Sequence, residues 1–147
     1  MRALIQRVSS AAVIVDDETV GEINAGLVVF LGVGAGDDEA DLNYVARKIV
    51  GMRVFEDEAG RMNRSVVDVG GSVLLVSQFT LYGDLRKGRR PGFDRAAEPE
   101  EAHRLYEAMI DVLSQDVPVR TGRFGARMRV HITNEGPATF WLDSADR

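Results

Sequence analysis

Runs of apolar and β-branched residues recur along the chain, separated by polar turns. Such residues fit a pleated, half-buried surface, so these runs predict strands. The predicted strands cover residues 3–15, 20–23, 26–33, 53–55, 73–81, 128–132 and 138–142. The runs 26–33 and 73–81 are apolar on both faces, which predicts central strands covered from both sides.

Two further segments repeat apolar residues with helical spacing. One stripe is Leu42, Val45, Ala46, Ile49 and Val50, and the other is Ala102, Leu105, Tyr106, Met109 and Leu113. We expect Asp37 to cap the first helix and Pro99 to begin the second. One-sided helices need a sheet to cover, so the pattern predicts a mixed α/β fold with helices on one face of a curved or doubled sheet. Without repeats or linkers, residues 1–147 are expected to form a single domain.

Composition excludes several classes of protein. The chain has no cysteine, so a disulfide framework, a thiol nucleophile and a Cys-based zinc site are ruled out. No apolar run approaches the roughly 20 residues of a membrane helix, and we expect a cytoplasmic protein. The net charge of −5 argues against general nucleic-acid binding, although residues 86–129 alone carry a net positive charge. That segment is either a solvated surface or a face for phosphates.

Familiar catalytic motifs are missing. Residues 32–36 are glycine-rich and lie between a strand and a helix, but they lack the last glycine of a dinucleotide fingerprint, which favours an ordinary turn. His103 and His131 have no metal-ligand spacing, and no G-x-S-x-G elbow is present. A hydrolase with this sequence is expected to use neither a metal, a cofactor nor a conventional triad.

Three polar segments remain as candidate sites. Residues 77–80 (Ser-Gln-Phe-Thr) either line a pocket at a strand end or run out into solvent. Residues 134–137 (Asn-Glu-Gly-Pro) either make a hairpin turn or, with a cis bond, a rigid polar tip. The basic loop 86–93 either contacts phosphates, with Phe93 stacked on a base, or is simply solvated.

Taken together, five segments resemble the bacterial and eukaryotic type of D-aminoacyl-tRNA deacylase. They are residues 3–8, 71–81, 90–93, 121–124 and 134–142. The pair Ser-Gln-x-x-Leu and Asn-x-Gly-Pro-x-Thr, at this separation, is the most specific part of the match, which runs nearly end to end.

The resemblance implies a three-layer β/β/α fold and a homodimer with two active sites at the interface. It assigns the floor of the site to Ser77, Gln78, Phe79 and Thr80. It also implies a cis Gly136-Pro137 tip that enters the partner's site and is fixed by Arg7, and it places Ala97 and Phe124 at the terminal adenosine of tRNA. The implied reaction is hydrolysis of the ester in D-aminoacyl-tRNA, and in glycyl-tRNA mischarged on tRNA-Ala, which would make the protein a chirality-proofreading hydrolase of translation.

The residues present suit such a reaction. An aminoacyl ester is already activated and needs water, positioning and oxyanion stabilisation. We expect the backbone N–H of Phe79 or Thr80 to hold the oxyanion and the tRNA 2′-hydroxyl to help activate water. The competing mechanism makes Thr80 a nucleophile. The rival functions are a Ser/Thr peptidase or esterase, an RNA-binding module without catalysis, and nucleotide binding at residues 32–36.

Overall fold

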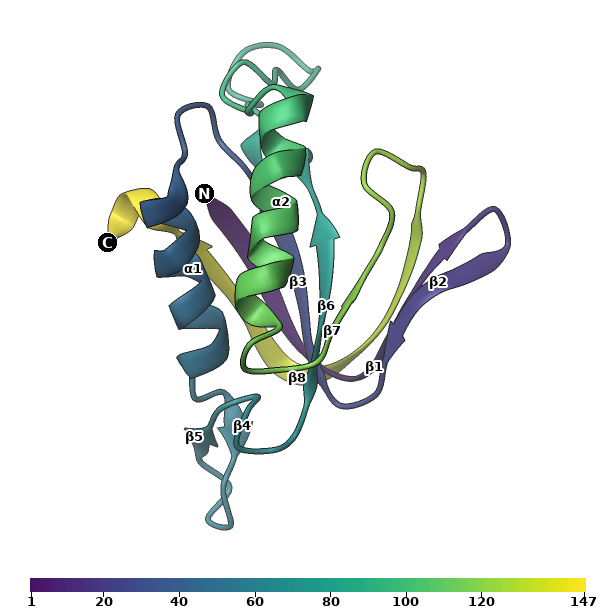
Figure 1. The fold of residues 1–147 in the computed structure, drawn as a ribbon, viewed down its shortest axis with the longest axis vertical. Coiled ribbons are helices and arrows are strands. Elements are labelled where there is room, and N and C mark those ends of the chain that lie inside the picture. The colour runs from purple at the N-terminus through teal and green to yellow at the C-terminus, as the bar shows by residue number, and fades with distance from the viewer.

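A computed structural model describes residues 1–147 (Figure 1). Six strands form a mixed sheet: β1 (Arg2–Val15), β2 (Glu18–Ile23), β3 (Gly26–Gly32), β6 (Ser72–Ser77), β7 (Val119–Thr121) and β8 (Arg129–Asp143). A two-stranded ribbon comprises β4 (Phe55–Glu56) and β5 (Met62–Arg64). The helices are α1 (Glu39–Gly51) and α2 (Pro99–Leu113), and short 3₁₀ turns are η1 (Phe79–Tyr82) and η2 (Ser144–Asp146). Neither α-helix is long and apolar enough to cross a membrane.

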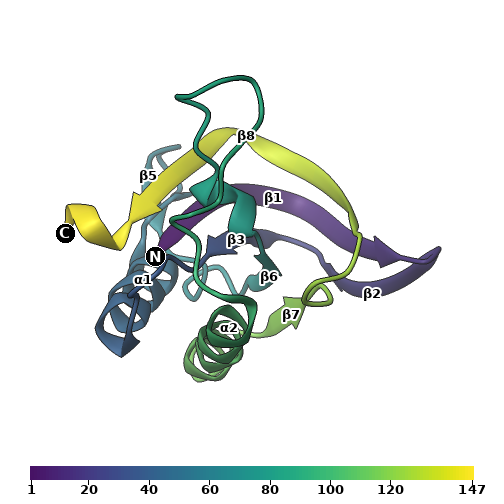
Figure 2. The same cartoon turned by 90° about the horizontal axis from the view of Figure 1, so that it is seen from above.

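The long strands β1 and β8 give the sheet its curvature. Along one edge, the first half of β1 pairs antiparallel with β3 and its second half pairs with β2. Along the other edge, β8 follows β1 for almost its whole length, with register shifts at Val8. Strands β3, β6 and β7 run parallel to one another. The second half of β1 therefore carries β2 and part of β8 away from the flat part of the sheet (Figure 2).

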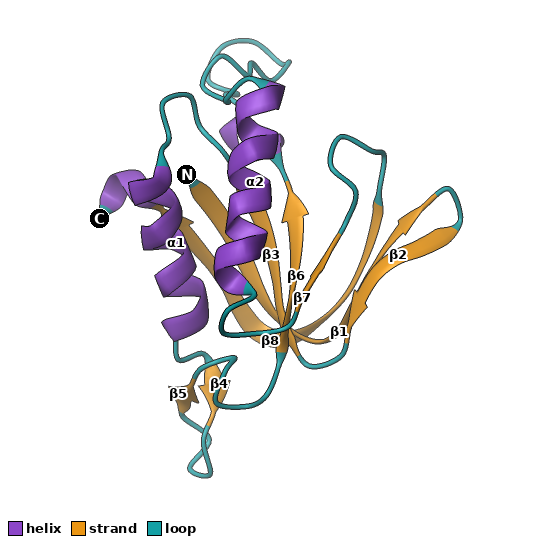
Figure 3. Cartoon of the chain, viewed as in Figure 1, coloured by secondary structure: helices purple, strands orange, loops and turns teal.

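Two apolar clusters divide the molecule into three layers. The larger cluster packs α1 and α2 against one face of the sheet and includes Ile5, Leu31, Leu75 and Met109. The smaller cluster lies on the opposite face, where Val28, Leu74 and Val76 meet the curled part of β1, β2 and β8. Figure 3 shows both helices on one side of the strands. This arrangement confirms the mixed α/β fold with helices on one face and the β/β/α layering.

The first helix begins one residue later than predicted. Its N-cap is Asp38, whose carboxylate accepts hydrogen bonds from the N–H groups of Ala40 and Asp41, and Asp41 completes a capping box. Asp37 instead accepts a hydrogen bond from the N–H of Gly34 and pairs with the amino group of Met1. The second helix begins at Pro99, as predicted.

Several predicted strand boundaries were wrong. The run 73–81 ends as a strand at Ser77, and η1 follows. The two terminal runs are one continuous strand, β8, so Gly136-Pro137 is not a hairpin turn but an irregularity within a strand. The run 53–55 contributes only Phe55 to a strand, and β5 and β7 were not predicted.

Candidate active site

A pocket of about 580 Å³ opens where β6 ends and α2 begins. Most of its lining is apolar. The lining residues come from four segments: Val33; Val76, Ser77, Gln78 and Phe79; Phe93, Ala96, Ala97, Glu98, Pro99 and Ala102; and Phe124, Gly125, Ala126, Met128 and Val130. Glu98 is the only one of them with an ionisable side chain. The chemistry available here therefore comes from hydroxyl, amide and backbone groups.

The end of β6 supplies the polar floor of this pocket. Ser77 is paired with Leu31, and the N–H of Gln78 donates to the Leu31 carbonyl at 2.7 Å. The Gln78 side-chain amide donates a hydrogen bond to the hydroxyl of Thr80. Thr80 itself is exposed and is not among the lining residues. Of the four predicted floor residues, the structure thus places Ser77, Gln78 and Phe79 on the pocket and Thr80 beside it.

The glycine-rich segment 32–36 explains how η1 is held in place. A Cβ atom on Gly34 would lie 2.6 Å from the hydroxyl of Tyr82, and one on Gly32 would lie 3.1 Å from Cβ of Leu81. These glycines let the end of η1 pack closely against β3. Burial, with the nearby carboxylates of Asp37 and Asp143, raises the pKa of Tyr82, so its ring stays neutral in this contact.

The α2 side of the pocket carries Ala97 and Phe124, the two residues that the resemblance assigns to the terminal adenosine of tRNA. The N–H of Ala97 donates to the Val33 carbonyl at 3.0 Å, which anchors the start of α2 to β3. The Phe124 ring stacks on His103, with centroids 4.5 Å apart and an interplanar angle of 21°. Tyr106 supports Phe124 from 5.8 Å. His103 therefore supports Phe124 from behind, a role that could not be predicted because His103 lies outside the apolar stripe of its helix.

The Gly136-Pro137 tip lies on β8, and its peptide bond is cis. Both residues are exposed. Buried Arg7 donates to the Glu135 carbonyl at 2.9 Å and to the Val54 carbonyl at 2.7 Å. The Asn134 amide donates to the carbonyl of Arg7 at 2.9 Å. The segment before the tip is thus fixed to β1 by the side chains of Arg7 and Asn134.

The structure does not bring this tip to the pocket of the same chain. Arg7 is paired with Leu27 of β3, whereas Ser77 is paired with Leu31, four residues further along. Strands β8 and β6 are separated by β1 and β3. With about 3.3 Å per residue and about 4.8 Å per strand, the tip and Ser77 lie roughly 20 Å apart. Any joint action of these two groups would need the tip of another copy.

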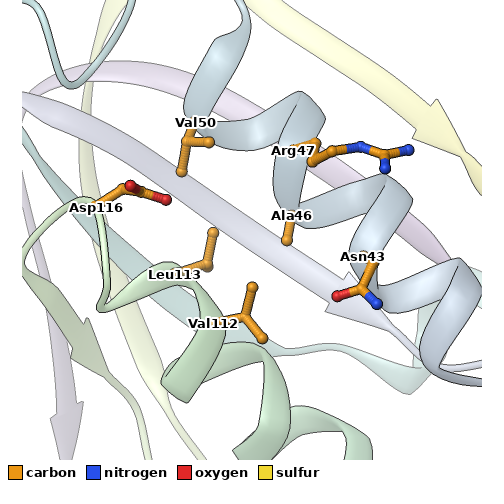
Figure 4. Close-up of a pocket in the computed structure, with 7 residues that line it drawn as sticks. All are labelled: Asn43, Ala46, Arg47, Val50, Val112, Leu113 and Asp116. Atoms are coloured by element: carbon orange, nitrogen blue, oxygen red, sulfur yellow. The ribbon is translucent and has the colours of Figure 1, made fainter.

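Four other hollows contain none of the residues assigned to the active site. A groove of about 250 Å³ lies between α1 and the end of α2 (Figure 4), with Arg47 and Asp116 as its charged residues. No group of three or more His, Cys, Asp or Glu side chains is arranged to hold a metal ion. His103 is hydrogen-bonded to Glu107, and His131 lies exposed on β8.

Comparison with known proteins places the chain in a family. The family model described as D-Tyr-tRNA(Tyr) deacylase matches residues 4–143. The chain belongs to the D-aminoacyl-tRNA deacylase family. This family consists of hydrolases, and the resemblance found in the sequence is confirmed.

Curated D-aminoacyl-tRNA deacylases match over almost their whole length. The one from Symbiobacterium thermophilum is 56% identical over 145 residues, covering 98% of this chain and 96% of that protein. The one from Heliobacterium modesticaldum is 58% identical over 144 residues, covering 97% and 96%. The match to these relatives therefore spans nearly the full length of both chains.

Two solved structures share the fold. One, titled c-Myc DNA Unwinding Element Binding Protein, superposes with a TM-score of 0.92 at 39% identity, covering 97% of this chain and 98% of that one. The other, titled as a probable eukaryotic D-amino acid tRNA deacylase, has a TM-score of 0.80 at 18% identity, covering 96% and 97%. The second likeness supports the deacylase fold alone.

Proposed function

We propose that the protein hydrolyses the ester bond of D-aminoacyl-tRNA, releasing the free D-amino acid and tRNA. The observation that carries the proposal is the pocket at Ser77, Gln78 and Phe79, which lacks an ionisable group other than Glu98, in a chain of the deacylase family. A pocket without a strong base suits an activated ester, which needs positioning more than proton abstraction. Glycine esters on tRNA-Ala would enter the same pocket, because glycine has no side chain to reject.

The oxyanion would be held by backbone amides at the start of η1. Phe79 and Thr80 are the first residues of this turn. The first N–H groups of a helix have no acceptor within the helix, so they remain available for a negatively charged oxygen. Such donors, fixed before the reaction, stabilise the charge that develops in the transition state.

In this mechanism Thr80 helps to position the substrate and does not act as the nucleophile that attacks the ester. A threonine nucleophile needs an adjacent base to take its proton. The hydrogen-bond partner that the structure gives to the Thr80 hydroxyl is the Gln78 amide, which acts as a donor. The same argument speaks against a Ser/Thr peptidase or esterase. The ribose 2′-hydroxyl of the substrate would then help to activate the attacking water.

Rejection of L-amino acids is assigned to the Gly136-Pro137 tip of a second copy in a homodimer. The support is geometric, since the tip is exposed, latched by Arg7, and roughly 20 Å from its own pocket by strand spacing. A fixed tip above the pocket would leave no room for an L side chain, while D side chains would point to solvent. This is selection by clash, so it predicts little discrimination among D-amino acids.

An apolar row on the sheet supports the association of two copies. Directly paired residues share a face of the sheet, and Trp141, Leu4, Phe30 and Val76 form one such row across β8, β1, β3 and β6. The row runs from Trp141, which is 51% exposed, through the half-buried Leu4 and Phe30 to Val76, which is buried at the pocket. Phe79, 55% exposed, lines the same pocket. Large exposed apolar side chains at both ends of such a row favour an interaction surface here.

Blocking the pocket tests the assignment of the site. The Ala102→Trp variant should lose release of tyrosine from D-Tyr-tRNA, because Ala102 lines the pocket. The matched control is Ala40→Trp, which adds the same side chain at an exposed position of α1 and should keep normal turnover. Full activity of both variants would show that the ester is not cleaved in this pocket. Binding of tRNA without any cleavage by the native protein would favour the RNA-binding function.

A further inference from the structure

Two positively charged segments flank the mouth of the pocket. The loop after η1 contributes Phe93, and the segment between β7 and β8 contributes Phe124, Ala126 and Met128. In Figure 1 these two loops stand on either side of the end of β6. Residues 117–134, which include the second segment, contain four arginines and no Asp or Glu. Cations are therefore concentrated on the segments around the pocket that holds Ser77, Gln78 and Phe79.

Not every cation in these loops is free. Arg86 is paired with Asp84 at 2.6 Å, and the side chain of Arg95 belongs to a different hollow, which Met1 and Asp37 also line. Arg120 lies on β7, before the pocket-lining part of its segment, which leaves six exposed cations in or directly beside the two flanking segments. We call Lys87, Arg89 and Arg90 the loop arm, and Arg123, Arg127 and Arg129 the strand arm.

No carboxylate lies within ion-pairing distance of any residue in the two arms. Elsewhere in the chain Arg64, Arg104 and Arg147 have carboxylate partners, whereas Arg47, Arg53 and Arg61 are also exposed and unpaired but lie on and after α1, away from this pocket. A surface whose only role is to keep the protein solvated gains nothing from unpaired like charges held close together, because they repel one another. Six unpaired cations grouped on the two segments that flank one pocket, in a chain of net charge −5, therefore indicate an anionic partner.

The residue types specify what kind of anion this is. Five of the six cations are arginines. The guanidinium presents a planar set of donors that binds phosphate oxygens in pairs, which a lysine ammonium does not do. In the strand arm the arginines alternate with the pocket-lining residues Phe124, Ala126 and Met128, so their exposed side chains lie on the outer side of this wall of the pocket. A nucleotide in the pocket would therefore lie between the two segments that carry the arms, with the remainder of its chain leaving past their cations.

We propose that the loop arm and the strand arm together bind the sugar-phosphate backbone of the tRNA acceptor end and guide its terminal nucleotide into the pocket. The proposal rests on the proposed deacylase function and extends it from the ester to the polynucleotide. It makes binding of the tRNA depend on these six side chains, whereas the chemistry on the ester does not depend on them.

Charge-removal variants test the two arms separately. The variants are Lys87→Ala/Arg89→Ala/Arg90→Ala and Arg123→Ala/Arg127→Ala/Arg129→Ala. The control, Arg47→Ala/Arg53→Ala/Arg61→Ala, removes three exposed and unpaired cations on and after α1. The first probe is uncharged tRNA, whose dissociation constant is measured between 50 and 200 mM salt. Each arm variant should bind tRNA on the order of tenfold more weakly near 0.15 M salt. The magnitude of the slope of log K against log salt concentration should fall by about 2–3, because three phosphate contacts are lost.

The second probe is D-tyrosyl-adenosine, an ester without phosphates. Both arm variants should cleave it at the native rate while their kcat/KM for D-Tyr-tRNA falls with the tRNA affinity. Arginine-to-lysine substitution throughout the strand arm should restore part of the tRNA affinity. Equal losses in the control variant, or unchanged tRNA binding in both arm variants, would overturn the proposal. An equal loss on D-tyrosyl-adenosine would likewise overturn it, because the arms would then act on the fold.

The same experiment separates this proposal from the proposed function. If the native protein cleaves neither ester, the deacylase function fails, while the salt dependence of tRNA binding still tests the arms. A DNA duplex serves as the competitor. Weak competition is expected, whereas displacement of tRNA at equal concentration would overturn the assignment of this surface to tRNA.

Discussion

The latch between Arg7 and the segment before the Gly136-Pro137 tip gives the sharpest single perturbation. In Arg7→Ala, the carbonyls of Glu135 and Val54 lose charged donors at 2.9 and 2.7 Å. Such bonds contribute about 1.5–3 kcal/mol each, and the two lost methylenes about 0.8 kcal/mol each. The variant no longer has to remove a guanidinium from water, which costs several kcal/mol, and this gain offsets part of the loss. The free energy of unfolding should therefore fall by about 3 kcal/mol.

Urea denaturation at a fixed protein concentration measures this change. With a typical m-value of about 2 kcal/mol per molar, the midpoint should fall by about 1.5 M. The control is Ser10→Ala, which removes an exposed hydrogen bond to Thr133 between the same two strands and should shift stability by less than about 0.5 kcal/mol. Arg7→Ala should also begin to cleave L-Tyr-tRNA, because the tip is no longer fixed. Unchanged stability together with unchanged selectivity would refute the latch.

Three further predictions concern the mechanism, the sheet and pH. Thr80→Val should keep turnover of D-Tyr-tRNA within about tenfold; complete loss would make Thr80 the nucleophile. Gly26→Ala should lower the free energy of unfolding by several kcal/mol, because its Cβ would clash with a carbonyl oxygen of β6. The control is Gly51→Ala, whose Cβ would enter open space and which should stabilise the end of α1 by up to about 1 kcal/mol. Thermal unfolding measures both changes. Burial opposes ionisation of Asp41, but hydrogen bonds from a serine hydroxyl and Arg147 hold its pKa well below its usual value. The ionised Asp41 therefore stabilises the fold above about pH 4, and this stabilisation is lost as pH falls; the Tm deficit of Asp41→Asn at pH 7 should shrink in acid, and a constant deficit would contradict this.

The sequence was informative wherever one local pattern decides the structure. The apolar stripes of both helices are buried against the sheet, and Pro99 begins α2. The apolar runs of β3 and β6 are central strands with cover on both faces. The resemblance of the two motifs to the deacylase family was confirmed by the family match.

Features that depend on distant contacts could not be predicted. The end of β6 at Ser77 follows from the packing of η1 on Gly32 and Gly34, which no local pattern records. The segment around Gly136 continues as a strand because β1 pairs with it on both sides of the tip, although Gly and Pro predict a turn. Likewise, β7 is too short to show a period, and His103 matters only through its stacking on Phe124.

Release of tyrosine from matched D-Tyr-tRNA and L-Tyr-tRNA, with EDTA present, tests the central claim most directly. The account predicts rapid loss of the D form and persistence of the L form, because the pocket supplies hydroxyl, amide and backbone groups and the tip excludes L side chains. Cleavage of both forms would contradict exclusion by the Gly136-Pro137 tip. Cleavage of neither form would contradict the deacylase function itself.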